Sequence, residues 1–148
     1  PAVVDGTVYI GNDAGFVVAV DQETGEEQWR FQAQDAVVSS PAIADGVVFV
    51  GSGDQNVYAI DAATGQLNWS YQTGDQVISS PAVADGVVFI GSFDGYIYGL
   101  DAVTGAERWH YQSGPILASP SVVDGVVYFG SADGRVLARQ PFNLLNLH

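Results

Sequence analysis

Short apolar runs alternate with turn-forming residues along the whole chain, and one unit of this pattern spans residues 39–71. Within each run, apolar and polar or small residues alternate with a period of two, which is typical of half-buried β-strands. No stretch shows the spacing of three to four residues that marks an amphipathic helix. The unit therefore predicts no helix and four short strands, at 39–44, 47–52, 57–61 and 67–71.

The connections between these strands have the composition of tight turns. Asp45-Gly46 separates the first two strands, and an Asp-Gly pair between two apolar runs favours a two-residue hairpin because both turn positions take positive φ. Residues 53–56 form the second connection, and Ala63-Thr64-Gly65 forms the third. Since all three connections are short, we expect the four strands to pair as an antiparallel meander.

The same unit recurs with a period of 40 residues, so the chain is a tandem array. Residues 39–74 and 79–114 are identical at 22 of 36 positions. The Asp-Gly pair occurs four times, as Asp5-Gly6, Asp45-Gly46, Asp85-Gly86 and Asp124-Gly125. We divide the single domain 1–148 into repeats of about 1–38, 39–78, 79–118 and 119–148, and the last repeat is degenerate.

A four-stranded meander in 40 residues is typical of one blade of a β-propeller. The coils of a parallel β-helix are shorter, and an immunoglobulin-like sandwich has no such period. A blade has two apolar faces that only its neighbours cover, so blades stack around an axis. The predicted fold is all-β, a β-propeller of four-stranded antiparallel blades with about four blades per chain. That number is half of an eight-bladed ring or a fragment of a longer propeller.

Three stretches carry a motif of the form A-x-D-x-x-T-G-x-x-x-W, at residues 19–29, 59–69 and 99–109, the last with Gly99 in place of the alanine. They resemble the tryptophan-docking motif of the pyrroloquinoline-quinone (PQQ)-like repeat propellers. The resemblance implies seven or eight blades around a channel, with each tryptophan stacked on the glycine region of a neighbouring motif. The expected blade-docking residues are Trp29, Trp69, Trp109, Gly25, Gly65, Gly105, Asp21, Asp61, Asp101, Thr24, Thr64 and Thr104.

We interpret these repeated residues as structural. A tryptophan at the same phase of every repeat buries about 200 Å² and suits the packing between blades. The threonine precedes a turn glycine, where its hydroxyl holds the backbone, and the aspartate caps the same turn. The serines before the prolines, at 39–40, 79–80 and 119, begin the strands that line the channel in the family's arrangement. We expect these serines to form hydrogen bonds at the strand starts rather than to contact a ligand.

The charge balance excludes two classes of partner. The chain has 17 acidic residues against four arginines and no lysine, a formal net charge of −13. Binding to nucleic acid or to an anionic membrane surface needs a clustered basic face, which this sequence lacks. No apolar run approaches the length of a membrane-spanning helix, so we predict neither nucleic-acid binding nor direct membrane insertion.

Candidate chemistry is sparse, and we predict no catalytic, cofactor-binding or metal-binding residue. Calcium would need carboxylates at alternate positions of a loop, whereas Asp54, Asp94 and Asp133 each stand alone in their turns. His110 has no nucleophile at a motif spacing. The resemblance extends to quinoprotein dehydrogenases, but those enzymes generally hold PQQ with a basic clamp and often use adjacent cysteines, and this chain has no cysteine.

The fourth repeat lacks the docking motif. At the expected position of its aspartate stands Gln140, and residues 140–148 either supply a substitute outer strand or cap the array. An open half-ring exposes two apolar blade faces, more than a soluble monomer tolerates. We therefore expect a homodimer that closes an eight-bladed ring, or else a piece of a longer propeller.

The predicted function is a non-catalytic propeller scaffold that binds protein or peptide partners through its loops or channel rim. The resemblance allows an assembly factor, a cell-surface module or a sensor-type module, and it implies an extracytoplasmic location. Two alternatives remain, a fragment of a PQQ-binding oxidoreductase and a ligand-sensing ectodomain. Function of this kind depends on sites grafted onto the fold rather than on the fold itself.

Overall fold

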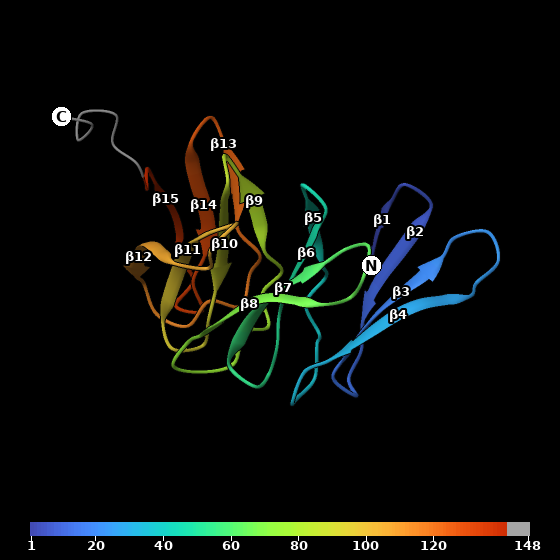
Figure 1. Ribbon diagram of the computed structural model, residues 1–148. Coiled ribbons are helices and arrows are strands. Elements are labelled where there is room, and N and C mark those ends of the chain that lie inside the picture. Colours follow the sequence, from blue (N-terminus) through green and yellow to red (C-terminus); the bar gives the residue numbers. More distant parts are fainter. Residues whose placement is uncertain (142–148) are drawn as a thin grey trace.

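The computed structural model describes residues 1–141, which form fifteen β-strands in four antiparallel sheets without a helix. The sheets follow one another along the chain and lie side by side (Figure 1). Three sheets have four strands, in the orders β1-β2-β3-β4, β5-β6-β7-β8 and β9-β10-β11-β12, and the fourth has three, β13-β14-β15. The expected all-β propeller architecture of about four blades is confirmed. We call the four sheets blades 1 to 4.

The strands are short, and their bounds repeat from blade to blade. Blade 1 contains β1 (Ala2–Val4), β2 (Thr7–Gly11), β3 (Phe16–Asp21) and β4 (Glu27–Gln32). Blade 2 contains β5 (Ala42–Ala44), β6 (Val47–Gly51), β7 (Asn56–Asp61) and β8 (Leu67–Gln72). Blade 3 contains β9 (Ala82–Ala84), β10 (Val87–Gly91), β11 (Tyr96–Asp101) and β12 (Glu107–Gln112). Blade 4 contains β13 (Ser121–Val123), β14 (Val126–Gly130) and β15 (Val136–Arg139).

The Asp-Gly pairs form the hairpin between the first two strands of every blade. In blade 2, Asp45 has φ 50° and Gly46 has φ 73°, and the pairing of Ala44 with Val47 leaves only these two residues in the loop. The other three pairs have nearly the same angles. This geometry matches the right-handed twist of the flanking strands, so the sequence signal for the hairpin is confirmed.

A bulge interrupts the pairing of the third and fourth strands at the same place in blades 1 to 3. In blade 2, Ala59 pairs with Trp69 while the next residue, Ile60, pairs with Leu67, so Asn68 is the extra residue. Blades 1 and 3 shift register between Ala19 and Val20 and between Gly99 and Leu100. A bulge increases local twist and redirects the adjacent side chains, here directly before the tryptophan.

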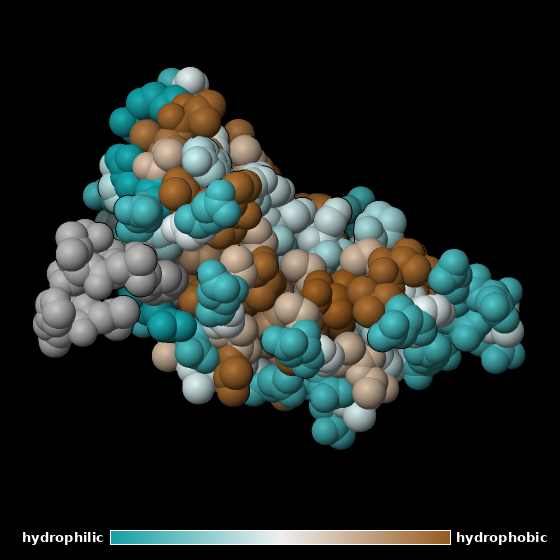
Figure 2. Space-filling view, turned by 90° about the horizontal axis from the view of Figure 1, so that it is seen from above, coloured by the Kyte–Doolittle hydropathy of each residue, from teal (hydrophilic) through white to brown (hydrophobic). Residues whose placement is uncertain are grey.

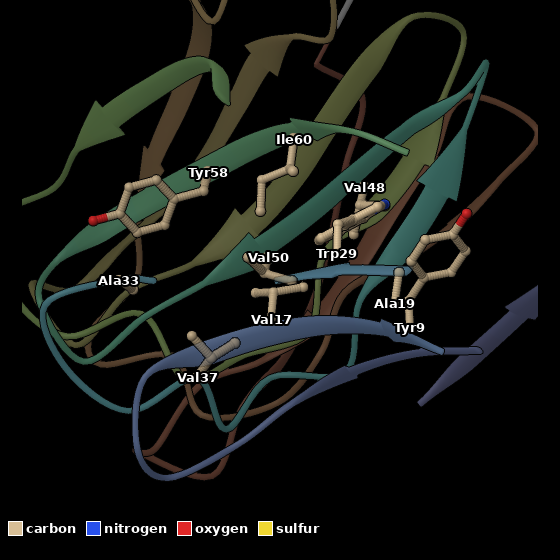
Figure 3. Close-up of a cluster of buried hydrophobic side chains, with 10 residues drawn as sticks. All are labelled: Tyr9, Val17, Ala19, Trp29, Ala33, Val37, Val48, Val50, Tyr58 and Ile60. Carbon is tan, nitrogen blue, oxygen red and sulfur yellow. The ribbon is translucent and has the colours of Figure 1, made fainter. Parts of the chain in front are cut away.

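Apolar side chains of successive blades interdigitate, and we call the side of a blade that meets the following blade its back face and the opposite side its front face. Between blades 1 and 2 (Figure 3), Tyr9, Val17, Ala19 and Trp29 on the back face of blade 1 meet Val48, Val50, Tyr58 and Ile60 on the front face of blade 2. Equivalent clusters join blades 2 and 3 and blades 3 and 4. Each interface buries mostly β-branched and aromatic side chains, which suit a pleated surface.

The first strands of neighbouring blades contact one another, so β1, β5, β9 and β13 form the inner end of the array. By the strand order, β4, β8 and β12 form the outer edge. Viewed from above, the surface carries hydrophobic patches between hydrophilic ones (Figure 2). Within residues 1–141, no helix is long or apolar enough to span a membrane. The predicted role of residues 140–148 as an outer strand or cap falls, from residue 142 onward, outside the described residues.

Candidate functional site

The aspartate and threonine of each docking motif are used inside their own turn. In blade 2, Oδ1 of Asp61 accepts hydrogen bonds from the backbone N–H groups of Ala63 and Thr64, at 3.0 and 2.9 Å, and from the Thr64 hydroxyl at 3.0 Å. Asp21 and Asp101 accept the equivalent backbone bonds. Hydrogen bonds from the Thr64 backbone and hydroxyl hold the pKa of Asp61 below its usual value, because they favour the charged form.

The tryptophans of blades 1 and 2 lie on the glycine of the following blade. A Cβ atom added to Gly65 would come within 2.7 Å of Trp29 Cδ2, so only glycine leaves room for the ring. The indole Nε1–H of Trp29 donates to the Ala62 carbonyl at 2.9 Å. Trp69 lies on Gly105 and donates to the Ala102 carbonyl at 3.0 Å. Each docked ring therefore contributes both apolar burial and a satisfied donor.

Gly25 has the same turn but no ring against it. Its φ is 73°, against 75° for Gly65, yet no heavy atom lies within 4 Å of the position of its Cβ. Trp109, at the other end of the series, is only partly buried and stacks on Tyr111 with ring centroids 6.4 Å apart. Within the described residues, two of the three predicted tryptophans, Trp29 and Trp69, thus lie against the motif glycine of the following blade. Gly25 in blade 1 is left open.

Both end faces of the array carry the residue types that are buried at its internal interfaces. On the front face of blade 1, Val8, Ile10, Val18 and Val20 stand where blade 2 has Val48, Val50, Tyr58 and Ile60, and Ile10 is 40% exposed. On the back face of blade 4, Val136 is 82% exposed, whereas its repeat equivalents Val57 and Ile97 are fully buried. Tyr128, the equivalent of buried Phe49, is also exposed. Exposed apolar surface of this kind marks an interaction surface.

The serines at the inner strand starts are engaged in backbone hydrogen bonds. The buried Ser39 hydroxyl accepts from the Gly51 N–H and donates to the Gly51 carbonyl, both at 3.0 Å. The Ser80 hydroxyl accepts from the Ser40 N–H at 2.8 Å, and the Ser119 hydroxyl accepts from the Ser80 N–H at 3.0 Å. These serines therefore tie strand to strand and blade to blade around the inner end.

Aspartates in the turn between the second and third strands link a blade to the connection that precedes it. In blade 2, Asp54 accepts a hydrogen bond from the Gln34 N–H of the preceding connection at 2.9 Å and one from the Tyr58 hydroxyl at 2.5 Å. Asp94 does the same in blade 3, with Gly74 and Tyr98 as donors. Burial raises the pKa of Asp54, but these hydrogen bonds outweigh burial and the pKa lies below its usual value.

One cluster of titratable side chains was not found from the sequence. A hollow of about 210 Å³ between the outer parts of blades 2 and 3 is lined by Tyr71, Tyr96, Tyr98, Glu107 and His110. The Tyr71 hydroxyl donates to Glu107 Oε2 at 2.5 Å, and His110 Nδ1 meets Glu107 Oε1. We call this cluster the tyrosine–glutamate groove. Aligning the repeats and noting where blade 3 departs from blade 2 would have pointed to three of its five residues.

A second hollow of about 200 Å³, between the same two blades, is mainly apolar. It lies beside the turns of blades 2 and 3 and is lined by Ala44, Asp45, Val47, Phe49, Asn68, Val83, Gly86, Ala102 and Val103. Several of these side chains pack against the core cluster that includes Trp69, so the hollow is a shallow extension of the interface between blades 2 and 3.

The residues present do not fit PQQ. The quinone carries three carboxylates, and paired cations are the groups that hold such an anion. All four arginines lie outside the inner strands and have acidic or aromatic neighbours. Arg30 pairs with Glu27, Arg108 lies 3.9 Å from Asp101, Arg135 pairs with Asp133, and the Arg139 guanidinium lies 4.1 Å from the centroid of the Tyr111 ring. Over residues 1–141, no group of three His, Asp or Glu side chains is arranged to hold a metal ion.

Comparison with known proteins identifies the family. A family model described as outer membrane protein assembly factor BamB matches residues 1–82 and 74–143. The chain belongs to this family. The expected resemblance to the PQQ-like repeat propellers is therefore confirmed. None of the curated proteins compared with the chain is significantly similar to it in sequence.

Solved structures of other proteins with this kind of propeller extend the comparison. BamB from Moraxella catarrhalis is 28% identical, with a TM-score of 0.82 over 91% of this chain and 43% of its own. Quinohemoprotein alcohol dehydrogenase ADHIIG from Pseudomonas putida HK5 is 27% identical, with a TM-score of 0.78 over 88% of this chain and 27% of its own. The computationally designed Ika4 protein, at 23% identity and a TM-score of 0.84, covers 93% of this chain and 86% of its own and shows the fold alone. The chain thus spans less than half the length of the BamB structure.

Proposed function

We propose that this chain is a non-catalytic β-propeller scaffold that closes a ring with a second copy of itself and binds protein or peptide partners through its loops or channel rim. The similarity to a BamB structure supports a scaffold or assembly role, and an extracytoplasmic location, in the periplasm or at the cell surface, is part of the proposal. The partner class is a protein or peptide.

The observation that carries this proposal is the pair of uncovered end faces. The back face of blade 4 offers Tyr128 and Val136, and the front face of blade 1 offers Ile10 beside the open glycine, Gly25. Every internal interface of the array is built from a back face on a front face. Two copies related by a two-fold axis would form this contact twice and close a ring of eight blades. Closure would remove both apolar faces from water.

Light scattering after size exclusion tests the closure. We expect twice the chain mass of 15.6 kDa for the wild type. Val136→Glu places a charge on the end face, and since closure uses that face twice, the dimer is expected to weaken by about 100-fold or more. Val103→Glu is the matched control, because Val103 is 84% exposed in a turn outside both end faces. A monomeric wild type, or equal behaviour of the two variants, would refute ring closure.

The oxidoreductase alternative is separated by titration with PQQ, followed by absorbance with and without Ca²⁺. The 27% identity to a quinohemoprotein alcohol dehydrogenase favours that alternative, whereas the dispersed and paired arginines favour the scaffold. We expect no saturable binding of the quinone. Saturable binding at one site per chain would overturn the non-catalytic assignment.

A further inference from the structure

The tyrosine–glutamate groove differs from the equivalent place between blades 1 and 2 at positions that packing does not dictate. Both interfaces contain the same aromatic pair, Phe31 with Tyr58 at 5.1 Å and Tyr71 with Tyr98 at 5.5 Å between ring centroids. Around that pair, blade 2 has Asn56, Leu67 and Ser70, whereas blade 3 has Tyr96, Glu107 and His110. Since the interface between blades 1 and 2 packs without these three residues, the fold does not require them in blade 3.

The three departures add a carboxylate, a further aromatic ring and an imidazole beside the aromatic pair. The Glu107 side chain is 33% exposed, and hydrogen bonds from Tyr71 and His110 lower its pKa, so it is ionised at neutral pH. Tyr96 adds a ring at 6.0 Å from Tyr98, and the His110 ring meets it edge-on at 5.5 Å. A carboxylate beside aromatic faces attracts cations through both charge and the ring quadrupole.

Blade 1 shows what such a set of side chains holds. Phe16 and Glu27 occupy the positions of Tyr96 and Glu107, and Arg30 occupies that of His110. The Arg30 guanidinium lies 5.1 Å from the centroid of the Phe16 ring and donates to both Glu27 oxygens, at 2.7 and 2.5 Å. In blade 1 the chain thus supplies its own guanidinium to an aromatic ring and a glutamate at the positions equivalent to Tyr96 and Glu107.

The next interface places a different arginine against an aromatic ring. Tyr111 is the repeat equivalent of Tyr71, and Arg139 of blade 4 lies over its ring at 4.1 Å and donates to its hydroxyl. Between blades 2 and 3 the tyrosine and glutamate are present, but the position of Arg30 holds the shorter His110. The hollow of about 210 Å³ remains beside it, which is the size of a side chain rather than of a whole drug-like ligand.

We propose that the tyrosine–glutamate groove binds the guanidinium of an arginine that a protein partner supplies. The arginine side chain enters the hollow, its plane lies against the Tyr96 or Tyr71 ring, and its N–H groups donate to Glu107. This contact rests on the proposed scaffold function and names the chemistry of its partner, a basic segment with at least one exposed arginine. The net charge of −13 favours approach of such a segment.

A peptide titration tests the groove in the full chain. The probe is a capped five-residue peptide of glycine and serine with one central arginine, compared with the same peptide carrying citrulline or lysine. Two-dimensional NMR follows the ring signals of the tyrosines and yields the dissociation constant. We expect the citrulline peptide to bind about tenfold more weakly, since it keeps the shape and loses the charge. The shifts are expected to be largest at Tyr71 and Tyr96.

Three variants locate the binding and control for overall charge. Glu107→Gln is expected to weaken binding about fivefold or more, and Glu27→Gln, which changes the net charge equally but lies at the equivalent place in blade 1, is expected to change it less than twofold. His110→Arg recreates the arrangement of blade 1 and is expected to abolish binding by filling the groove from within. Equal effects of the two glutamate variants, equal binding of citrulline, or full binding by His110→Arg would refute the proposal.

The outcome is separable from that of ring closure because the groove lies between two internal blades. Peptide binding by a monomeric chain would support the groove and refute closure. A dimer that binds the arginine and citrulline peptides equally would refute the groove alone.

Discussion

Adding one methyl group to Gly65 tests whether tryptophan docking stabilises the stack of blades. Gly65→Ala places a Cβ at 2.7 Å from Trp29 Cδ2 and 2.8 Å from two further atoms of the ring, so the indole must move. Gly25→Ala is a matched control. Gly25 has the same motif and nearly the same positive φ, but nothing lies within 4 Å of its Cβ position.

The structure sets the size of the two effects. Both substitutions force alanine into the left-handed region, at a cost of about 1–2 kcal/mol. Only Gly65→Ala also displaces a docked ring, and overpacking of this kind costs about 1–3 kcal/mol. Moving the ring further weakens the hydrogen bond of Trp29 to the Ala62 carbonyl, whose net value is about 1 kcal/mol. We therefore expect Gly65→Ala to be less stable than Gly25→Ala by about 1–4 kcal/mol.

Urea unfolding followed by tryptophan fluorescence measures this difference, at a protein concentration where both variants are monomeric, because ring closure would cover the face that contains Gly25. Gly105→Ala repeats the experiment on Trp69, since its Cβ would lie 2.6 Å from the ring. We expect the Gly105 and Gly65 variants to lose similar amounts of stability. If Gly25→Ala destabilises the protein as much as the other two, the cost is backbone strain alone and the docking argument is wrong.

Three further predictions use the repeat as an internal control. Trp69→Ala is expected to lower the free energy of unfolding by about 3–5 kcal/mol and Trp109→Ala by clearly less, because Trp109 is only partly buried; chemical unfolding measures both. Ser39→Ala is expected to cost about 1–3 kcal/mol by removing the hydroxyl partner of the buried Gly51 backbone groups, whereas exposed Ser40→Ala changes stability by less than about 0.5 kcal/mol. The carboxyl of Asp61 has a lowered pKa in the folded state, so its stabilisation is present above its ordinary pKa of 3.8 and is lost as the pH falls through the lower folded value. Asp61→Asn is expected to flatten the loss of stability below about pH 4 in urea titrations, and an unchanged pH profile would contradict this.

The parts of the fold that depend on local chemistry were readable from the sequence. The Asp-Gly pairs predict two-residue hairpins because few residues other than glycine, asparagine and aspartate take positive φ, and Asp45-Gly46 has that geometry. The 40-residue period predicts blades because a four-stranded unit has two apolar faces to cover. In the turn between the second and third strands, the sequence predicts the backbone less well. There Gln55 has a φ of 75°, whereas the other blades have glycine at this position.

The arrangement between blades was less accessible to sequence reasoning. A strand pattern shows which residues share a face, but not that Tyr71 of one blade reaches Glu107 of the next, 36 residues away. His110 has no nucleophile at a motif spacing, so catalytic motifs do not single it out. The pairing across the interface depends on how one blade is rotated against its neighbour, and that rotation follows from the packing of whole faces rather than from any short motif.

The structure also separates two roles of the acidic residues. Twelve of the 17 acids are aspartates that recur from one repeat to the next, and in the docking turns their carboxylates already accept hydrogen bonds from their own backbone, as Asp21 and Asp61 do. Asp54 and Asp94 tie one blade to the connection before it. Such carboxylates keep their charge but have used much of their hydrogen-bonding capacity. They attract a basic partner over long range and steer its approach without selecting its contacts. Under the proposed arginine contact, selection falls to Glu107, which lines a hollow together with aromatic rings and replaces the Leu67 of blade 2.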